Sequence, residues 1–270
     1  MEQESSKVLR KTLSDGEIHR KWVNTYRTEK NDRFYEMAFD AIVREIHPPE
    51  GAMFLDAGCG SCQHSLRLAQ RGFRVTAVDF SQSALALAKD NIRAKGMTDR
   101  ITLSRQDLTS LSFPSATFDY ILCWGVLMHI HDVRGAILEL SRVLKPGGYL
   151  VVSENNAYSV QSMSIRFLKS ILRPSENAHD KYDWGFEFWE DTPVGRLLTR
   201  QNNIPGLLRL FRETGIQPEK RMAGQFSELY SVFHSPLLQT LIHQFNAVWF
   251  RHVKVPYLAF GNILFMKSTP

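Results

Sequence analysis

The chain has 270 residues, of which 43% are hydrophobic and 23% charged, which is typical of a folded protein with a sizeable buried core. The formal net charge is +5 with basic and acidic residues interspersed, so the charge allows an anionic partner or membrane surface without requiring one. The first residues are polar and unlike a signal peptide, and no stretch is long enough to span a membrane. The chain has only three cysteines, too few for a disulfide framework. These features favour a cytoplasmic protein over a secreted or integral membrane protein.

Residues 1–50 are expected to form two helices ahead of a sheet. Apolar residues recur at helical spacing from Phe34 to Ile46, and the prolines that follow end the helix. Upstream, Trp22 and Tyr26 lie four residues apart, so they share one helix face. They are candidates either for packing this helix on the sheet or for closing over a ligand.

The first strand ends in an acid and is followed by glycines. The apolar run 53–55 predicts a buried parallel strand that ends at Asp56, and Gly58 and Gly60 follow. Glycine suits a sharp strand-to-helix turn and lets a ligand approach the backbone. A second strand ends in Asp79, 23 residues after Asp56, where an acid can accept the hydroxyls of a ribose. The fingerprint G-x-G-x-x-G is incomplete, which favours a nucleoside over a dinucleotide.

Further motifs follow in order. Residues 106–108 end a third strand, residues 118–123 form a fourth, and residues 144–149 lead into a fifth. Together with 56–60 and 78–81, these motifs resemble those of class I S-adenosylmethionine-dependent methyltransferases, over roughly three-fifths of the chain. The resemblance implies an α/β, Rossmann-like sheet of seven mostly parallel strands with helices on both faces and an antiparallel last strand.

The resemblance also implies S-adenosyl-L-methionine as the cofactor and S-adenosyl-L-homocysteine as the product. Asp79 would hold the ribose, Asp107 the adenine amino group, and the glycine loop the methionine end. An acid such as Asp107, taken alone, would more readily be a helix cap or a solvated loop acid, and the series of motifs favours the cofactor role. The residues that the family pattern assigns to the cofactor are Tyr26, Asp56, Gly58, Gly60, Asp79, Phe80, Asp107, Leu108 and Cys123. The ring of Tyr26 would attract the positive sulfonium.

Cys59 and Cys62 form a C-x-x-C pattern inside the glycine loop. No second cysteine pair is available to complete a zinc site, so both are interpreted as small packing residues and no metal site is predicted. Cys62 departs from the family pattern, because many members carry a third glycine at this position.

Candidate catalytic bases follow the fourth and fifth strands. Residues 123–131 lack the Asn/Asp-Pro-Pro-Tyr/Phe motif, the nucleophilic cysteine context and the metal-binding acids of three common methyltransferase chemistries. His131 and His129 have pKa values suited to general-base work, although the turn around His129 is widespread in the family, which favours a structural or cofactor-adjacent role for His129. Glu154, expected in the loop after the fifth strand, is the third candidate.

Residues 155–205 are too long for a simple crossover and are expected to form an inserted cap. Aromatic residues concentrate at 182–189 and either line an acceptor pocket or form the small core of the insertion. Arg200 is the first candidate for binding a phosphate, if the acceptor carries one. Near the end of the chain, the helix that reaches 249–252 either packs on the sheet or touches a membrane surface.

The predicted organisation is an N-terminal helical segment at 1–50, a cofactor-binding core at 51–154, the cap at 155–205 and the completion of the sheet at 206–270. The expected activity is methyl transfer to an oxygen or nitrogen of a small-molecule, sugar or lipid-linked acceptor. The alternatives are an RNA or protein methyltransferase and a non-catalytic binding module on the same fold. A nucleic-acid partner and a nicotinamide cofactor are both disfavoured, and the oligomeric state is left open.

Overall fold

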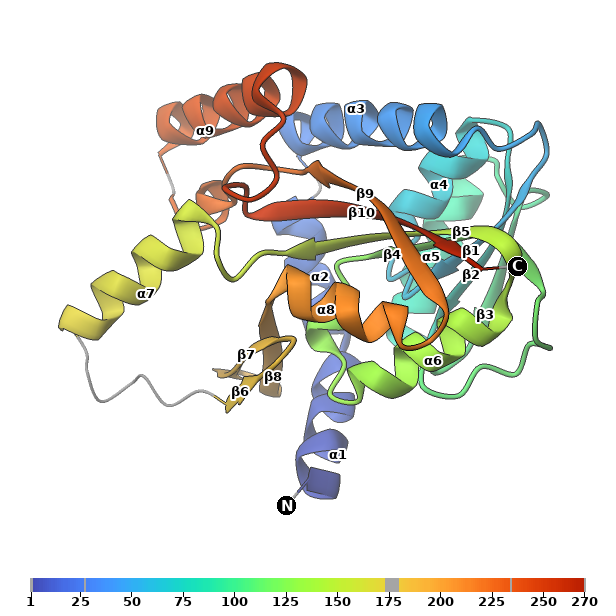
Figure 1. The fold of residues 1–270 in the computed structure, drawn as a ribbon, viewed down its shortest axis with the longest axis horizontal. Coiled ribbons are helices and arrows are strands. Elements are labelled where there is room, and N and C mark those ends of the chain that lie inside the picture. The colour runs from blue at the N-terminus through green and yellow to red at the C-terminus, as the bar shows by residue number, and fades with distance from the viewer. Residues whose placement is uncertain (1, 27, 173–179, 234, 270) are drawn as a thin grey trace.

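The computed structural model describes residues 2–26, 28–172, 180–233 and 235–269. Its centre is a seven-stranded sheet with the strand order β3-β2-β1-β4-β5-β10-β9 (Figure 1). The strands of this sheet are β1 (Met53–Ala57), β2 (Arg74–Asp79), β3 (Ile101–Arg105), β4 (Phe118–Trp124), β5 (Leu144–Asn155), β9 (Ile216–Ala223) and β10 (Gly261–Ser268).

Strands β1 to β5 pair in parallel, whereas β10 is antiparallel to both β5 and β9. The central strands read as apolar runs because both faces of the sheet are covered; Phe54 and Leu55, for example, are both buried although they point to opposite faces. The predicted seven-stranded sheet with an antiparallel last strand is confirmed. Strand β5 is longer than expected and includes Glu154, which the sequence placed in a loop.

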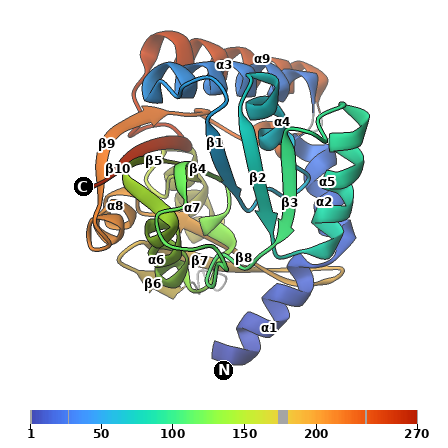
Figure 2. The same cartoon turned by 90° about the vertical axis from the view of Figure 1, so that its right-hand side faces the viewer.

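Helices cover the two faces of the sheet with separate apolar cores. One face carries α3 (Glu29–Ile46), α4 (Gln63–Gln70) and α5 (Gln82–Ala94), and the other carries α6 (Val133–Val143) and α8 (Ile204–Arg212). Figure 2 shows these layers on either side of the sheet, with α9 (Pro236–Val248) lying beside α3. Among the helices described, none is both long enough and apolar enough to cross a bilayer.

The N-terminal segment forms three helices instead of the two predicted: α1 (Glu2–Leu13), α2 (Gly16–Tyr26) and α3. The start of α3 is fixed by Thr28, whose hydroxyl accepts a hydrogen bond from the Asn31 amide at 3.2 Å. Helix α1 was missed because its apolar side is narrow; among its described side chains, the buried apolar ones are Leu9 and Leu13, which pack against the insertion.

The insertion contains α7 (Val160–Leu172) and a three-stranded antiparallel sheet. The strands of this small sheet are β6 (Asp180–Tyr182), β7 (Gly185–Thr192) and β8 (Gly195–Asn202). Strand β8 packs against α1 and against the turn η1 (Leu127–His129) that follows β4. The insertion therefore connects the N-terminal helices with the carboxyl edge of the main sheet.

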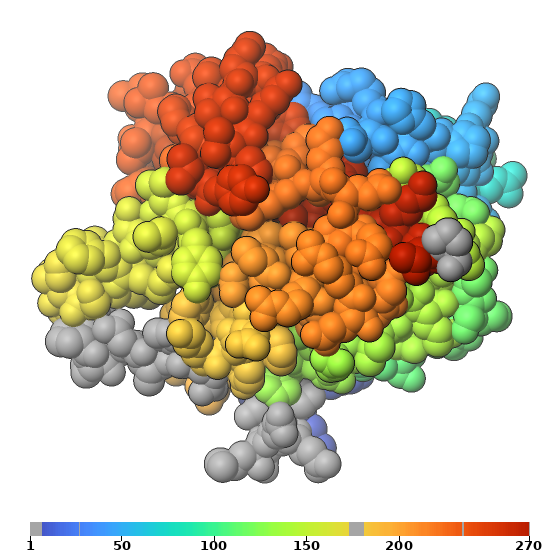
Figure 3. Space-filling view, in the orientation of Figure 1, coloured from blue at the N-terminus to red at the C-terminus, as the bar shows by residue number. Residues whose placement is uncertain are grey.

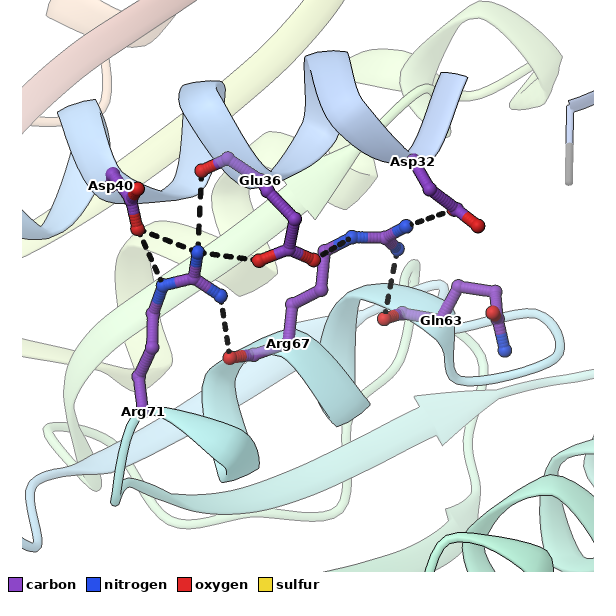
Figure 4. A network of polar contacts seen from close by, with 6 residues as sticks. All are labelled: Asp32, Glu36, Asp40, Gln63, Arg67 and Arg71. Carbon is purple, nitrogen blue, oxygen red and sulfur yellow. Dashed lines mark hydrogen bonds and ion pairs between the residues drawn. The ribbon is translucent and has the colours of Figure 1, made fainter. Parts of the chain in front are cut away.

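An ion-pair network fastens α3 to α4, the helix that follows the glycine loop (Figure 4). Arg67 and Arg71 on α4 reach three acids on α3, namely Asp32, Glu36 and Asp40. The Arg67 side chain is only 7% exposed and its guanidinium lies 4.9 Å from the centroid of the Tyr35 ring. Arg67 thus fixes both the helix pair and an aromatic side chain near the carboxyl edge.

We expect Arg67→Met to lower the free energy of unfolding by about 1–2 kcal/mol, because it removes a buried cation from acids that stay half-exposed. Urea denaturation followed by circular dichroism measures the change. The control is Arg33→Met on α3, whose partner Glu29 is exposed like Arg33 itself, so its effect stays within about 0.5 kcal/mol. Equal losses in the two variants would contradict a stabilising role for the network.

Candidate active site

The loop after β1 is bound to the neighbouring strand β2. The amides of Gly58 and Cys59 both donate to the carbonyl oxygen of Val78, at 2.9 and 2.8 Å. Gly58 has a φ of +78°, and a Cβ at this position would lie 2.6 Å from the side chain of Val126. Both the backbone conformation and the contact therefore require glycine.

The position where many relatives carry a third glycine is also left-handed. Cys62 has a φ of +62°, a left-handed conformation that favours glycine, so this chain carries a strained residue at this position of the loop. Both Cys59 and Cys62 are buried in the apolar core beneath the loop, which confirms their interpretation as packing residues.

Two of the predicted acids meet at this loop. Asp56 is buried and accepts a hydrogen bond from the Ser65 hydroxyl at 2.5 Å; burial raises the pKa of its carboxyl to about 7. The two oxygens of Asp79 accept from the amides of Gly60 and Ser81, each at 2.9 Å. Burial raises the pKa of Asp79, and these amides oppose the shift. The structure therefore brings together Asp56, Gly58, Gly60 and Asp79, as the spacing predicted.

The N-terminal helix covers the end of the site that the family pattern gives to adenine. Arg10 of α1 pairs with Asp107, which also accepts from the amide and hydroxyl of Thr109 at 3.0 and 2.9 Å. Burial alone would raise the pKa of Asp107, but these hydrogen bonds lower it overall. The Arg10 guanidinium also lies 5.5 Å from the centroid of the Phe80 ring. Arg10 is a site residue that sequence reasoning missed, since nothing local marks a partner 97 residues away.

Two further cofactor candidates, Leu108 and Cys123, belong to the apolar core. Leu108 and Cys123 are both buried in the cluster that α6 and α8 cover. They can shape the floor of the site, and Cys123, at the end of β4, is fully enclosed.

Helix α2 lies across the carboxyl edge of the sheet. His19 Nε2 lies 2.9 Å from the Ser81 hydroxyl and 2.8 Å from the Leu13 carbonyl oxygen. One turn further along α2, the Trp22 ring stacks on His129 with 5.1 Å between the ring centroids. These contacts were not predicted, and they hold the N-terminal helices over the strand ends.

The three predicted base candidates surround the turn after β4. His129 Nδ1 lies 2.7 Å from the Leu198 carbonyl oxygen, and burial lowers the pKa of the ring, so the imidazole is neutral. His131 Nδ1 lies 3.8 Å from a carboxylate oxygen of Glu187 on β7. Both histidines are therefore oriented by the insertion.

Glu154 fixes this turn from below. Its Oε1 accepts from the amides of Leu127 and Val126, at 2.8 and 3.2 Å, and its Oε2 accepts from the Asn202 side chain at 3.0 Å. Burial raises the pKa of the carboxyl to about 7. These contacts indicate that Glu154 positions the turn, and its role as a base stays a prediction.

Arg200 does not face a phosphate site, which corrects the expectation from the sequence. It is fully buried, pairs with Glu187 directly across from it on β7, and donates to the carbonyl oxygens of Leu127 and Ile130 at 2.7 and 2.9 Å. A buried arginine whose donors serve the protein has none left for a ligand. Arg200 instead connects the insertion to the turn after β4.

A small hollow with a cavity volume of about 30 Å³ opens at the ends of β4, β5 and β9, and sequence reasoning missed it. The residues that line it are Phe34, Tyr35, Trp124, Ser153, Gly224, Gln225, Glu228 and Gly261. We call it the Glu228 pocket. It combines aromatic faces with a few polar groups, which is the usual composition of a small-molecule site.

Glu228 is the acid of this pocket. Burial raises the pKa of its carboxyl to about 7, and none of the described side chains donates a hydrogen bond to it. Its charge raises the pKa of Tyr26, and burial together with this charge raises those of Tyr35 and Tyr230. The hydroxyl of Tyr26 is thus near the pocket acid, so its predicted place beside the ligand remains consistent with the geometry. No motif around Glu228 marks it in the sequence.

Residues 55–152 match the model of a methyltransferase domain. The chain is 34% identical over 172 residues to a ubiquinone biosynthesis O-methyltransferase of Methylocella silvestris, covering 63% of this chain and 62% of that protein. It is 32% identical over 131 residues to a demethylmenaquinone methyltransferase of Clavibacter sepedonicus, covering 48% of this chain and 51% of that protein. The matched part therefore spans between about half and two thirds of these relatives.

The fold matches solved methyltransferase structures over more of the chain. The structure of an S-adenosylmethionine-dependent methyltransferase from Clostridium acetobutylicum superposes with a TM-score of 0.60 at 16% sequence identity, covering 92% of this chain and 96% of that one. At this identity the likeness concerns the fold, whereas the motifs at 55–152 carry the family relation. The resemblance stated from the sequence is confirmed: residues 55–152 match a methyltransferase domain, and the chain has the fold of S-adenosylmethionine-dependent methyltransferases.

Proposed function

We propose that this protein transfers a methyl group from S-adenosylmethionine to an oxygen or nitrogen of a small-molecule acceptor that binds at the carboxyl edge of the sheet, with its reacting atom toward the Glu228 pocket. The observation that carries the proposal is the meeting of Asp56, Asp79 and the left-handed Gly58 loop at adjoining strand ends. In open parallel sheets, ligands bind at this edge. The quinone names of the two relatives favour an acceptor with a ring, and the O-methyltransferase favours oxygen as the acceptor atom.

The residues present fit the cofactor. Each oxygen of Asp79 holds one backbone amide and keeps lone pairs that can accept from ribose hydroxyls. A Cβ at Gly60 would meet no atom within 4 Å, so the loop backbone there is open to the methionine end of the ligand. Asp107 can accept from the adenine amino group when Arg10 shares or leaves its carboxylate. Tyr26 would present its ring to the sulfonium.

When bound, S-adenosylmethionine supplies a strongly electrophilic methyl group. The protein then has to orient the acceptor, exclude water and, for a hydroxyl acceptor, take up its proton. Glu228 is the group best placed for the proton, because its carboxyl lies in the pocket and has a pKa near the working pH. His131, His129 and Glu154 remain alternatives, but backbone hydrogen bonds already engage His129 and Glu154.

Calorimetric titration with S-adenosylmethionine tests the cofactor. We expect the wild-type protein to bind it and not NAD, and Asp79→Ala to weaken binding about 30- to 150-fold, because two charge-assisted hydrogen bonds to the ribose are lost. The matched control is Asp119→Ala, a half-exposed acid near the start of β4 that pairs with Lys145. Binding of NAD instead, or of neither ligand, would rule out the proposal.

Alanine substitutions at two glycines distinguish the effect of backbone strain on stability from the effect of the loop shape on cofactor binding. Gly58 and Gly147 both have positive φ, but a Cβ at Gly147 meets no atom within 4 Å whereas one at Gly58 clashes with Val126. We expect both alanine variants to lose about 1 kcal/mol of stability from strain. Only Gly58→Ala should also lose cofactor affinity in calorimetry, and Val126→Ala should partly restore it. Equal affinity in the two alanine variants would contradict the role of the loop.

The raised pKa of Glu228 predicts a pH-dependent stability. Because the folded state holds this proton more tightly than the unfolded state does, the free energy of unfolding should fall as pH rises from about 5 to about 8. Asp56 and Glu154 act in the same direction. We expect Glu228→Gln to reduce the fall by about 1–2 kcal/mol in urea denaturation, a range that allows for the partial exposure of Glu228.

The control for this measurement is Glu219→Gln, an exposed acid on β9, which should leave the pH dependence unchanged. With a quinol-type acceptor, Glu228→Gln should also lower kcat about 100-fold or more and flatten the rise of kcat with pH through 7. A Glu228→Gln variant with the wild-type pH dependence would exclude Glu228 as a buried acid of the pocket.

A further inference from the structure

Two helices beside the Glu228 pocket present apolar side chains to solvent. Met163, Phe167 and Ile171 on α7 are 53%, 69% and 61% exposed, and Leu237, Leu241 and Phe245 on α9 are 71%, 52% and 49% exposed. Within each helix the three residues are four positions apart, so they form one line along it. We call these six residues the apolar face. Each line is an exposed apolar surface of the kind that marks an interaction site.

Both helices are tied to the segment that carries the pocket acid. Gln161 at the start of α7 accepts hydrogen bonds from the Ser227 hydroxyl at 2.8 Å and from the Glu228 amide at 2.9 Å. Asn246 of α9 exchanges hydrogen bonds with the backbone of Ser227 at 3.0 and 2.8 Å. Figure 1 shows both helices on the same side of the molecule, and Figure 3 shows α7 projecting from its body. The apolar face therefore belongs to two helices that are both hydrogen-bonded to the segment carrying Glu228.

The charged residues of the segments that carry this face are all basic. Residues 155–172 and 229–270 contain no aspartate or glutamate, although acids are spread through the rest of the chain. Lys169, Arg251 and Lys254 are exposed within these segments. Apolar side chains rimmed by lysine and arginine, without acids, are complementary to anionic headgroups above an acyl layer.

Helix α7 exposes apolar side chains on more than one side, which favours insertion into lipid over contact with a flat protein surface. Phe167 and Leu168 are consecutive, so they point about a quarter turn apart on the helix, and they are 69% and 55% exposed. Leu172 at the end of α7 is 68% exposed. A partner protein would cover one stripe of such a helix, whereas a lipid layer covers several sides at once.

We propose that the apolar face docks on an anionic lipid bilayer, with Lys169, Arg251 and Lys254 at the level of the lipid phosphates. Docking by itself does not require methyl transfer. If the proposed function holds, docking has a consequence: an acceptor dissolved in the bilayer would reach the Glu228 pocket directly. Only this consequence rests on the proposed function. A second copy of the chain or another protein on this face is the competing outcome.

The test is flotation of the full-length protein with vesicles of phosphatidylcholine alone and of phosphatidylcholine with one quarter phosphatidylglycerol. We expect flotation with the anionic vesicles and weaker flotation at high salt. Phe167→Glu and Leu241→Glu should each reduce vesicle affinity about tenfold or more, because each removes a large apolar side chain from the acyl boundary. The matched control is Leu138→Glu on α6, which is 48% exposed, far from the apolar face in sequence, and should float like wild type.

Replacing Lys169, Arg251 and Lys254 together by glutamine should remove the preference for anionic vesicles. We expect each lost cation to lower the affinity for these vesicles about fivefold. The proposal is overturned if wild type stays unbound with both vesicles, or if Phe167→Glu floats as well as wild type. A dimer that Leu241→Glu dissociates in sedimentation velocity, without vesicle binding, would assign the face to a second copy and also overturn it.

Calorimetry with S-adenosylmethionine on the same preparations separates the two proposals. Vesicle binding without cofactor binding would support docking and reject the proposed function. Cofactor binding without vesicle binding would reject docking alone.

Discussion

The attachment of the glycine loop to β2 is the constraint on which the rest of the site depends. Two amides of the loop share the Val78 carbonyl oxygen, and a third, from Gly60, meets the Asp79 carboxylate. Because β1 and β2 are parallel neighbours, their ends and their acids lie together without further support. The tight approach of the loop to Val126 then sets where the turn after β4 must run, and with it His129 and His131.

Which contacts could be predicted from the sequence depends on how far apart their residues lie along the chain. Asp56, the glycine loop and Asp79 were found because strand–loop–helix spacing fixes their relation within one unit. Arg10 on Asp107 and His19 on Ser81 were not found, since each pairs across at least 60 residues and depends on how the N-terminal helices fold back. The apolar residues of α7 recur at helical spacing, but such a pattern does not reveal whether the apolar face meets protein or solvent.

Arg200 illustrates the same limit for charged residues. Its position in the sequence shows a cation near a predicted ligand edge, whereas its role is decided by the register of β7 on β8, which sets Glu187 opposite it. Once that pair is buried, the guanidinium has to satisfy its other donors, and the carbonyl oxygens of the turn after β4 supply the acceptors. The pair therefore connects the insertion to the candidate site instead of binding a substrate.

The edge of the sheet also gathers acids whose burial is costly in the ligand-free protein. The carboxyls of Asp56, Glu154 and Glu228 all have a pKa of about 7, so near neutral pH each is only partly ionised. A cationic sulfonium near these groups would stabilise their ionised forms and so be bound more tightly as pH rises. By linkage, ligand binding would release protons from the same acids. Burial of these carboxyls makes their ionisation costly in the ligand-free protein. It therefore favours a positively charged ligand over the neutral product that remains after transfer.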